Sequence, residues 1–436
     1  MLPQSIFKER RQQLFANMLP NSIAVLFTAP EHLRNGDEYF TFRPNSDFYY
    51  LTGFNEPEAV AIFLKTDGQE KFILFNRVRD PHFEQWFGYR LGQTGAIEQL
   101  GADEAHAVHS LNEKMPILLS QAKYLYYAFG RYPQYDQQLD QWLYEIRSQI
   151  RSGLNAPYQI INIESILHEM RLIKSAEEIE LIEKSASINA EAHLRAMKLC
   201  QTGRYEYEIE AELIHEFTRQ NAREETFGTI IASGKNSCIL HYRANDRQIC
   251  SGDLVLIDSG CEYFYYGSDM TRTYPADGKF SAEQKMIYEL VLRMQAAGLA
   301  CMKPGNPWNQ AQTAAIRVLT EGLCDLGLLK GSVDGLIEQE AYFPFYMHRF
   351  SHWLGLDGHD VGSYKVEGQW RLLQPGMTLS AEPGLYIKAG MENVDKRWWN
   401  IGVRIEDMVL ITKAGHRLLT AEMPKGVDAI EQSMAG

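Results

Sequence analysis

Short apolar runs alternate with amphipathic segments over about the first 150 residues of the chain. The apolar runs have the length and composition of β-strands, and the segments between them have helical periodicity. The expected strands are residues 22–27, 59–64, 71–75 and 124–128, and the expected helices are 114–120 and 135–147. This alternation predicts an α/β layer arrangement around a mixed or parallel sheet.

Two helix start signals of the same form stand about 100 residues apart in the second part of the chain. Residues 175–178 (Ser-Ala-Glu-Glu) and 281–284 (Ser-Ala-Glu-Gln) are capping boxes, in which two side chains satisfy each other's free backbone N–H groups. Each expected helix ends close to a glycine, Gly203 or Gly305, and a second helical pattern follows. The repetition indicates an internal pseudo-duplication.

The length of 436 residues exceeds what one ordinary hydrophobic core supports, so two domains are expected. Residues 151–157 have the Ser, Gly, Asn and Pro composition of a connection, and one more short strand and helix follow it. We therefore expect an N-terminal domain over residues 1–172 and a second domain over residues 173–436.

Charge and cysteine usage limit the partners and the compartment. The net charge of −13 argues against nucleic acid or an anionic membrane as the main partner. We expect no membrane span, because no run of about 18 apolar residues occurs, and no export signal. The 6 cysteines form no Cys-x-x-Cys pair, which favours free, buried thiols and a cytoplasmic location.

A pair of aspartates follows a buried-strand pattern at residues 254–257. Asp258 ends this run, and Asp269 comes eleven residues later. If a hairpin closes around Tyr263 and Phe264, the two carboxylates lie opposite each other, where like charges are destabilising unless a cation separates them. The alternative is that one aspartate caps a turn and the other is solvated.

Three histidines, His348, His352 and His359, fall within twelve residues, although the whole chain has only 12. A single histidine is usually packed or solvated. Histidine is nevertheless the commonest metal ligand, so a cluster of this kind favours a functional site.

Two glutamates follow at strand-like positions. Glu382 stands at the end of the expected strand 377–381, before Pro-Gly. Glu406 shares one face of the strand 401–407 with Arg404. The alternative for Arg404 and Glu406 is an exposed face with a weak ion pair.

Four carboxylates in one cleft need compensation, because each buried charge requires a partner. One imidazole and four carboxylates supply enough ligands for two divalent ions that share bridging carboxylates, and an oxygen-rich set favours Mn²⁺. Two such ions would hold a bridging water and make it nucleophilic, which predicts hydrolysis. The candidate ligands are Asp258, Asp269, His352, Glu382 and Glu406.

In these motifs the chain resembles aminopeptidase P, a proline-specific family of pita-bread metallopeptidases. The resemblance spans nearly the whole chain. It rests on residues 35–37, 45–54, 56–59, 171–175, 257–260, 268–273, 352–362, 382–384 and 404–407. It implies an α/β (α+β) chain: an N-terminal α/β domain with a mixed sheet, then a pita-bread catalytic domain with a pseudo-twofold repeat.

The resemblance also implies an activity: removal of the first residue from peptides with proline at the second position, through a hydroxide that bridges two divalent metal ions. Asp258 would chelate one ion, Asp269 and Glu406 would bridge both, and His352 and Glu382 would complete the other site. Glu382 would also carry a proton from the water to the leaving nitrogen.

Further roles are implied by the same resemblance. His241 and His359 would stabilise the substrate carbonyl and the developing oxyanion. The proline-side pocket would be shaped by His348, Tyr386 and Arg404. Trp86 and Arg151 correspond to N-terminal-domain residues that close the site, and Asp37 corresponds to a residue that approaches a neighbouring subunit's cleft. A homotetramer is therefore expected.

Four alternatives share the implied architecture. Prolidase has the same metal set but requires a dipeptide. A methionine aminopeptidase is disfavoured because about 170 residues precede the catalytic part. A creatinase-like amidinohydrolase lacks the acidic ligands, and a metal-free scaffold module has typically lost them.

Overall fold

The computed structural model describes residues 2–66 and 68–435, so Met1 and Gly436, at the ends of the two expected domains, lie outside it. The chain divides into two compact units, Met1–Met170 and Arg171–Gly436. The division falls two residues before the expected boundary at residue 172, which assigns Arg171 and Leu172 to the second unit. Each unit is described by itself below.

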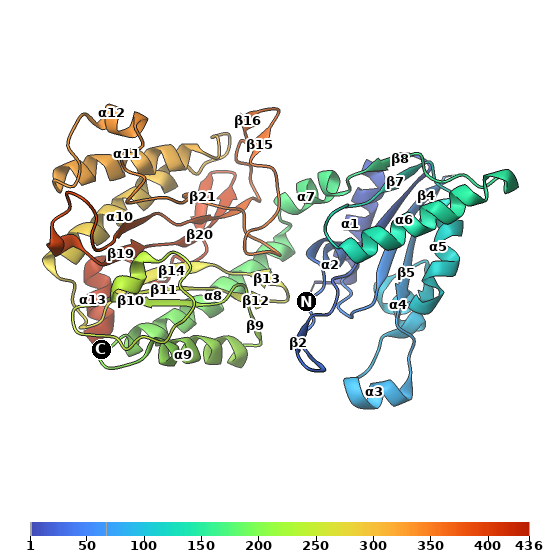
Figure 1. Cartoon of the computed structure of the whole chain (residues 1–436), viewed down its shortest axis with the longest axis horizontal. Helices are drawn as coiled ribbons and strands as arrows, with labels where there is room; N and C mark the ends of the chain where they lie inside the picture. Colours follow the sequence, from blue (N-terminus) through green and yellow to red (C-terminus); the bar gives the residue numbers. More distant parts are fainter. Residues whose placement is uncertain (1, 67, 436) are drawn as a thin grey trace. The chain divides into compact units, whose positions relative to one another are not determined.

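The N-terminal unit contains a mixed six-stranded sheet in the order β6-β5-β4-β1-β7-β8 (Figure 1). β1 pairs antiparallel with β4, and β4 with β5, whereas the other three pairs are parallel. The mixed sheet that the sequence predicts is therefore confirmed. Its strands are β1 (Ser22–Phe27), β4 (Val60–Thr66), β5 (Gln69–Asn76), β6 (Glu104–Ala107), β7 (Tyr124–Tyr126) and β8 (Gln159–Ile161).

Strand alternation sends side chains to both faces of this sheet. Ile23, Val25 and Phe27 pack with buried residues of α5 and α6 on one face. On the other face Phe63 stacks on Phe72 with ring centroids 5.2 Å apart. The helices and the small hairpin of this unit are α1 (Gln4–Asn17), α2 (Ser46–Thr52), α3 (Pro81–Phe87), α4 (Gly92–Leu100), η1 (Val108–Ser110), α5 (Leu111–Leu119), α6 (Pro133–Ser148), η2 (Ile150–Ser152), α7 (Glu164–Leu172, which runs into the second unit), β2 (Leu33–Asn35) and β3 (Glu38–Tyr39).

The C-terminal unit repeats one arrangement of helices and strands. Both predicted capping boxes form: the Ser175 hydroxyl accepts from the Glu178 N–H, and the Ser281 hydroxyl accepts from the Gln284 N–H. α8 (Ala176–Leu199) lies against β12 (Cys261–Tyr263), β13 (Tyr266–Gly267) and β14 (Met270–Pro275). α10 (Ala282–Cys301) lies against β17 (Thr378–Ala381), β18 (Gly384–Ile387) and β19 (Ile401–Arg404). The helices are α8 (Ala176–Leu199), α9 (Glu206–Arg219), η3 (Gly234–Cys238), α10 (Ala282–Cys301), α11 (Gln310–Asp325), α12 (Val333–Glu338), η4 (Lys396–Trp398) and α13 (Val427–Ala435).

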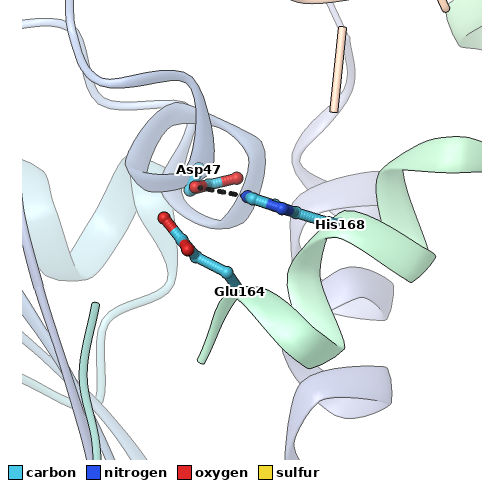
Figure 2. Close-up of side chains that lie close together, drawn as sticks. All are labelled: Asp47, Glu164 and His168. Atoms are coloured by element: carbon cyan, nitrogen blue, oxygen red, sulfur yellow. Dashed lines mark ion pairs between the residues drawn. The ribbon is translucent and has the colours of Figure 1, made fainter. Parts of the chain in front are cut away.

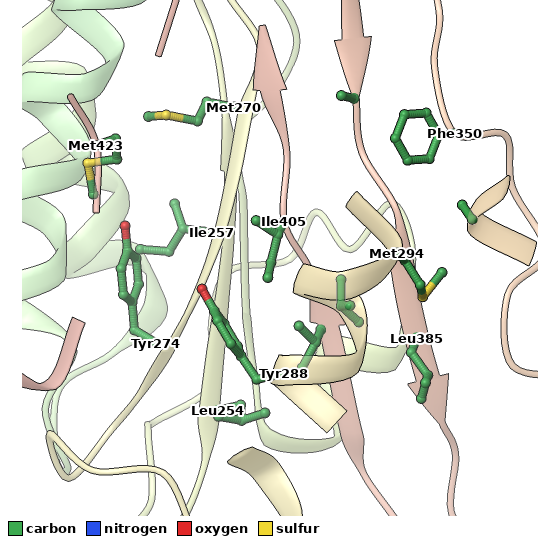
Figure 3. Close-up of a cluster of buried hydrophobic side chains, with 14 of the residues drawn as sticks. Leu254, Ile257, Met270, Tyr274, Tyr288, Met294, Phe350, Leu385, Ile405 and Met423 are labelled. Atoms are coloured by element: carbon green, nitrogen blue, oxygen red, sulfur yellow. The ribbon is translucent and has the colours of Figure 1, made fainter. Parts of the chain in front are cut away.

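One hydrophobic core joins the two halves of this unit (Figure 3). Ile257 and Tyr274 come from the first half, and Met294, Leu385 and Ile405 come from the second. The strands that carry this core and its surroundings are β9 (Glu224–Glu225), β10 (Ile230–Ser233), β11 (Leu254–Ser259), β12 (Cys261–Tyr263), β13 (Tyr266–Gly267), β14 (Met270–Pro275), β15 (Lys365–Val366), β16 (Gln369–Trp370), β17 (Thr378–Ala381), β18 (Gly384–Ile387), β19 (Ile401–Arg404), β20 (Asp407–Thr412) and β21 (Gly415–Leu418).

The hairpin between the two aspartates forms, but its register differs from the prediction. Phe264 and Tyr265 have φ of 49° and 70°, the left-handed conformation that a tight two-residue hairpin turn requires. With the tip there, Asp258 pairs with Thr271, and Asp269 lies diagonal to it rather than opposite. The prediction of directly opposed aspartates is therefore wrong, because the register is shifted by two residues.

Gly260 allows this turn to close, because a Cβ atom at that position would lie 1.9 Å from the Ser268 carbonyl oxygen.

Two further expectations concern the cysteines and the possibility of a membrane span. All six cysteines are free, as expected, but only Cys200, Cys238 and Cys261 are buried. The expectation of buried thiols is wrong for Cys250, which is exposed, and for Cys301 and Cys324, which are half-buried. Within residues 2–66 and 68–435, no helix combines the length and the apolar character that crossing a membrane would require.

Candidate metal centre

A cavity of about 780 Å³ opens in the C-terminal unit, and four acidic residues lie in its wall. Each acid stands at or beside the end of a strand, where the backbone leaves the sheet. Asp258 is the next-to-last residue of β11, and Asp269 directly precedes β14. Glu382 lies between β17 and β18, and Glu406 lies between β19 and β20. The sequence places these strands far apart, and the fold brings their ends to one cavity.

The ring of His352 is oriented toward these acids. Its Nδ1 lies 2.9 Å from the carbonyl oxygen of Trp353, and a carbonyl only accepts, so Nδ1 carries the proton. The Nε2 lone pair therefore points into the cavity, 3.4 Å from Asp269 Oδ2 and 3.4 Å from Glu382 Oε1. This is the tautomer, with the second nitrogen fixed by a carbonyl, that a metal-binding histidine adopts.

The acids lack full compensation from the protein. Burial raises the pKa of Asp269 and Glu406 well above the ordinary range, and repulsion from the neighbouring acids adds to the effect. Burial also raises the pKa of Glu382. Asp258 Oδ1 and Glu406 Oε1 are buried and have no hydrogen-bond partner among the described residues.

A cation would satisfy both features. Ligand atoms of Asp269, His352 and Glu406 lie within 4.8 Å of one another, and Glu406 Oε1 is 3.9 Å from His352 Nε2. Buried unpaired carboxylate oxygens and a correctly oriented imidazole are the donor set of a metal site. The five residues proposed as ligands thus face one cavity and fit divalent cations.

Arg404 occupies the interior of this site. Its Nη2 lies 2.6 Å from Asp258 Oδ2, and its Nε donates to the Thr271 hydroxyl at 3.2 Å. That hydroxyl donates in turn to Glu406 Oε2 at 2.9 Å. Arg404 is 4% exposed and Glu406 1%, so the alternative of an exposed strand face with a weak ion pair is wrong.

A hydrogen-bond chain continues from Arg404 to the rim. Arg404 Nη1 donates to the Tyr386 hydroxyl at 3.1 Å, and that hydroxyl donates to His348 Nε2 at 2.9 Å. His348 Nδ1 then donates to the carbonyl of Arg349 at 2.9 Å. Burial raises the pKa of Tyr386 to about 12 and lowers that of His348 to about 3. Both groups are neutral and both His348 nitrogens are engaged, so the side chains of Arg404, Tyr386 and His348 form a rigid wall of the cavity.

Two further histidines line the cavity and are exposed to it, His241 and His359. The His359 ring centroid lies 4.3 Å from that of His352. Burial lowers the pKa of His359, and the neighbouring His352 and His241 add to this effect. A neutral imidazole with an accessible N–H can donate a hydrogen bond to a carbonyl oxygen in the cavity.

Comparisons with known proteins bear on this site. The model of metallopeptidase family M24 matches residues 180–413, and the model of the aminopeptidase P N-terminal domain matches residues 7–126. The chain belongs to metallopeptidase family M24.

Named relatives of this M24 chain cover almost all of it. It is 46% identical to the Xaa-Pro aminopeptidase of Escherichia coli K12 over 98% of this chain and 97% of that protein. It is also 46% identical to the Xaa-Pro aminopeptidase of Haemophilus influenzae, over 99% of this chain and 98% of the relative.

Solved structures show the same fold. Aminopeptidase PepP of Pseudomonas aeruginosa superposes with a TM-score of 0.98 at 49% identity, covering 100% of this chain and 98% of the other. Zinc-substituted E. coli aminopeptidase P in complex with product superposes with a TM-score of 0.97 at 45% identity, again covering 100% and 98%. The two-domain pita-bread architecture expected for an M24 enzyme of this kind is confirmed.

Three residues expected to act at the site belong to the N-terminal unit. Asp37 lies between β2 and β3, Trp86 in α3, and Arg151 in η2, and all three are exposed. Every described residue that lines the cavity belongs to the C-terminal unit of this M24 chain. The roles of these three residues remain predictions.

Sequence reasoning missed the polar residues that hold the ligands. Thr271 bonds Glu406, and the Ser380 hydroxyl accepts from the His352 N–H at 3.0 Å and donates to Glu382 Oε1 at 3.3 Å. Both lie two residues from an acid on the same strand face, as period-2 alternation would indicate.

A second acid–imidazole cluster lies in the N-terminal unit (Figure 2). His168 Nε2 is 3.5 Å from Asp47 Oδ2, and Glu164 is on the same helix one turn earlier. Arg131 Nη1 lies 2.7 Å from Asp47 Oδ2 and 4.0 Å from Glu164 Oε1. Because the Arg131 guanidinium already contacts both acids, we interpret the cluster as an ion-pair network.

Proposed function

We propose that this protein is a metal-dependent Xaa-Pro aminopeptidase, which removes the N-terminal residue from peptides with proline at the second position. The observation that carries the proposal is the orientation of His352 Nε2 toward Asp269 and Glu382, beside carboxylate oxygens that lack partners. Relatives named Xaa-Pro aminopeptidase, 46% identical over nearly the full length, support it.

The proposed ligands are divided between two cations. Asp258 would hold one ion, Asp269 and Glu406 would serve both, and His352 and Glu382 would complete the second site. We propose Mn²⁺ as the ion, because four carboxylates and one imidazole form a hard, oxygen-rich set. When bound, the ions supply Lewis acidity, which polarises a carbonyl and makes water nucleophilic near neutral pH.

The side chains supply proton transfer and charge stabilisation. Glu382 has a pKa raised by burial, which suits it to take a proton from water and give it to the leaving nitrogen. His241 and His359 donate hydrogen bonds to the substrate carbonyl as negative charge develops on its oxygen. The acids of the cavity also attract the free ammonium group of the first residue.

The proline requirement follows from the rigid wall of His348, Tyr386 and Arg404. The nitrogen of proline carries no N–H, and its ring fixes φ, so strand-like hydrogen bonding to that nitrogen is impossible. A preformed wall of two neutral rings and one paired guanidinium can hold the proline ring by shape instead.

We also propose a cytoplasmic homotetramer. The six free cysteines suit a reducing compartment, and the tetramer follows from the family resemblance. Asp37 would then approach the cavity of a neighbouring subunit, while Trp86 and Arg151 would close over bound substrate. Analytical ultracentrifugation measures the subunit number.

The test is hydrolysis of Ala-Pro-Leu and of the dipeptide Ala-Pro, before and after chelation and after Mn²⁺ addition. We expect cleavage of the tripeptide only, its loss on chelation, and its recovery with Mn²⁺. Turnover of the dipeptide alone would favour prolidase, and activity indifferent to chelation would reject the metal site. Glu382→Ala should lower kcat by about 10²–10⁴-fold, as expected for loss of a general acid–base. The exposed Glu392→Ala serves as its matched control.

A further inference from the structure

We propose that Arg243 and Arg349 form a carboxylate-binding subsite at the rim of the cavity, on the side of the leaving group. The ligand class is an anionic carboxylate that follows the substrate proline, either the C-terminal carboxylate of a short peptide or an acidic side chain. This inference rests on the proposed function and deepens it by naming a preferred substrate class.

Both arginines line the cavity and neighbour residues on its leaving-group side. Arg349 directly follows His348, whose ring belongs to the rigid wall proposed to hold the substrate proline (the proline wall). Arg243 follows His241 by two residues. His241 and His348 line the same cavity as the two arginines. The segments that carry the two arginines therefore both border this cavity.

Neither guanidinium is neutralised by the protein. Both residues are exposed, and no described carboxylate lies within 4.0 Å of either side chain. The contrast is with Arg404 and Arg272 of the same unit, which are buried and paired with Asp258 and Asp407. Two unpaired cations at one rim leave positive charge where a substrate's carboxylate would arrive.

The backbone around Arg243 is shaped to hold its side chain. The Arg243 Nη1 atom lies 2.6 Å from where a Cβ atom on Gly228 would be, so the guanidinium rests close to the backbone of Gly228. The Arg243 Cζ atom is also 5.9 Å from the ring centroid of Phe227, another cavity residue, within the range of a cation–π contact. A guanidinium held in this way presents its planar fork to a carboxylate with less loss of side-chain freedom.

The backbone at Arg349 is fixed by a different contact. Its carbonyl accepts the hydrogen bond from His348 Nδ1 at 2.9 Å, so the start of its side chain is tied to the proline wall. The cavity volume of about 780 Å³ is in the range that holds a ligand of drug size. An extended tripeptide spans roughly 10 Å, so a substrate anchored at the acids can extend toward the rim.

The test compares substrates that differ only in charge after the proline. One arm measures kcat/KM for Ala-Pro-Leu and its C-terminal amide, and the other measures Ala-Pro-Glu-amide and Ala-Pro-Gln-amide. We expect wild-type protein to prefer the charged member of at least one pair by about tenfold, as a charge-assisted hydrogen bond provides. The arm that shows the preference identifies the source of the carboxylate.

Arg243→Ala and Arg349→Ala should each reduce this preference severalfold, and the double variant should abolish it, largely through KM. The lysine variants should restore part of it, since they keep the charge but lose the planar fork. Arg293→Ala, an exposed arginine of α10 that does not line the cavity, should keep the wild-type ratio. Raising the salt concentration should weaken the preference.

Equal kcat/KM for the charged and neutral members of both pairs would overturn the subsite, as would variants that slow all four peptides equally. If no peptide were cleaved at all, the proposed function would be rejected, but the proposed subsite would not. Calorimetric titration with Pro-Leu and Pro-Leu-amide would then still decide the subsite, because tighter binding of the acid by wild type than by the double variant needs no turnover.

Discussion

The Nη2 atom of Arg404 lies 2.6 Å from Oδ2 of Asp258, and both side chains are buried although 146 residues separate them in the sequence. The same guanidinium donates to the Tyr386 hydroxyl, so Arg404 connects the acids of the cavity to the proposed proline wall. Arg404 thus compensates Asp258 through Oδ2 and leaves Asp258 Oδ1, Asp269 and Glu406 for cations.

Replacing Arg404 should destabilise the metal-free protein more than the loaded one. Arg404→Met removes the cation that pairs with buried Asp258, and breaking a buried pair costs about 3–5 kcal/mol. Bound Mn²⁺ would neutralise Asp258 in its place and reduce the loss. Urea unfolding with and without Mn²⁺ measures both values, with the exposed Arg397→Met as the control. An equal loss in both conditions would contradict this account.

Replacing Glu406 should instead stabilise the metal-free protein. Burial and the neighbouring acids raise its pKa, which shows that its charge is unfavourable in the metal-free protein. Glu406→Gln should therefore raise the metal-free Tm, by roughly 2–4 °C for each kcal/mol of repulsion relieved. It should also abolish the rise in Tm that Mn²⁺ produces in the wild type, since a ligand stabilises only what it binds. Differential scanning calorimetry tests both; a lowered metal-free Tm would show that the acids do not repel.

The stability of the protein should depend on pH through His193, which is not one of the proposed metal ligands. The His193 side chain is fully buried; its Nε2 lies 3.0 Å from the Ser259 hydroxyl and its Nδ1 lies 3.2 Å from the Tyr274 hydroxyl. Burial, with a smaller contribution from Arg272, lowers its pKa from 6.5 to about 3. The folded state thus favours the neutral ring. Its contribution is full above pH 6.5 and is lost as the pH falls toward 3, because the unfolded state then binds the proton.

The slope of unfolding free energy against pH should include about 1.4 kcal/mol per pH unit from His193 in this window. His193→Gln should flatten that slope while costing about 1–2 kcal/mol at pH 7, where its hydrogen bonds are weakened. Urea unfolding at several pH values between 4 and 8 measures both. An exposed histidine, His215→Gln, should leave the slope unchanged.

Asp360 holds the loop that carries His359. Its Oδ1 is 2.5 Å from Arg171 Nη2, and its Oδ2 is 2.9 Å from Lys174 Nζ. Burial acts to raise the pKa of Asp360, but the two cations hold it below the ordinary value. Asp360→Asn removes an acidic partner from two buried cations, of which Arg171 keeps its pair with Asp357. We expect a loss of about 3–5 kcal/mol in urea unfolding, mainly from the uncompensated charge of Lys174.

A matched surface pair provides the comparison for that loss. Arg317 Nη2 lies 2.7 Å from Asp334 Oδ1, as close as the buried pair, but the side chains are 54% and 83% exposed. Asp334→Asn should cost far less than Asp360→Asn, because solvent screens an exposed pair. Equal losses in the two variants would show that burial does not determine the strength of these pairs.

Local patterns in the sequence were sufficient for much of the fold. Strand β1 has the predicted ends, and both capping boxes form, because the hydrogen bonds of a helix start involve residues only three apart. Strand and helix periodicity likewise reports which side of an element is buried. The residues proposed as ligands were identified from residue type, position and family resemblance, and they line one cavity.

Contacts between distant segments were decided only by the tertiary structure. The position of the hairpin tip at Phe264–Tyr265 sets the register of Asp258 and Asp269, and no pattern distinguished it from a tip one residue earlier. The burial of Arg404, its pairing with Asp258, and the His352 tautomer all depend on which strands pack beside β19 and on which carbonyl meets the ring. A sequence lists the charges of a site, but their net interaction depends on distance and burial, and both arise only when the chain is packed.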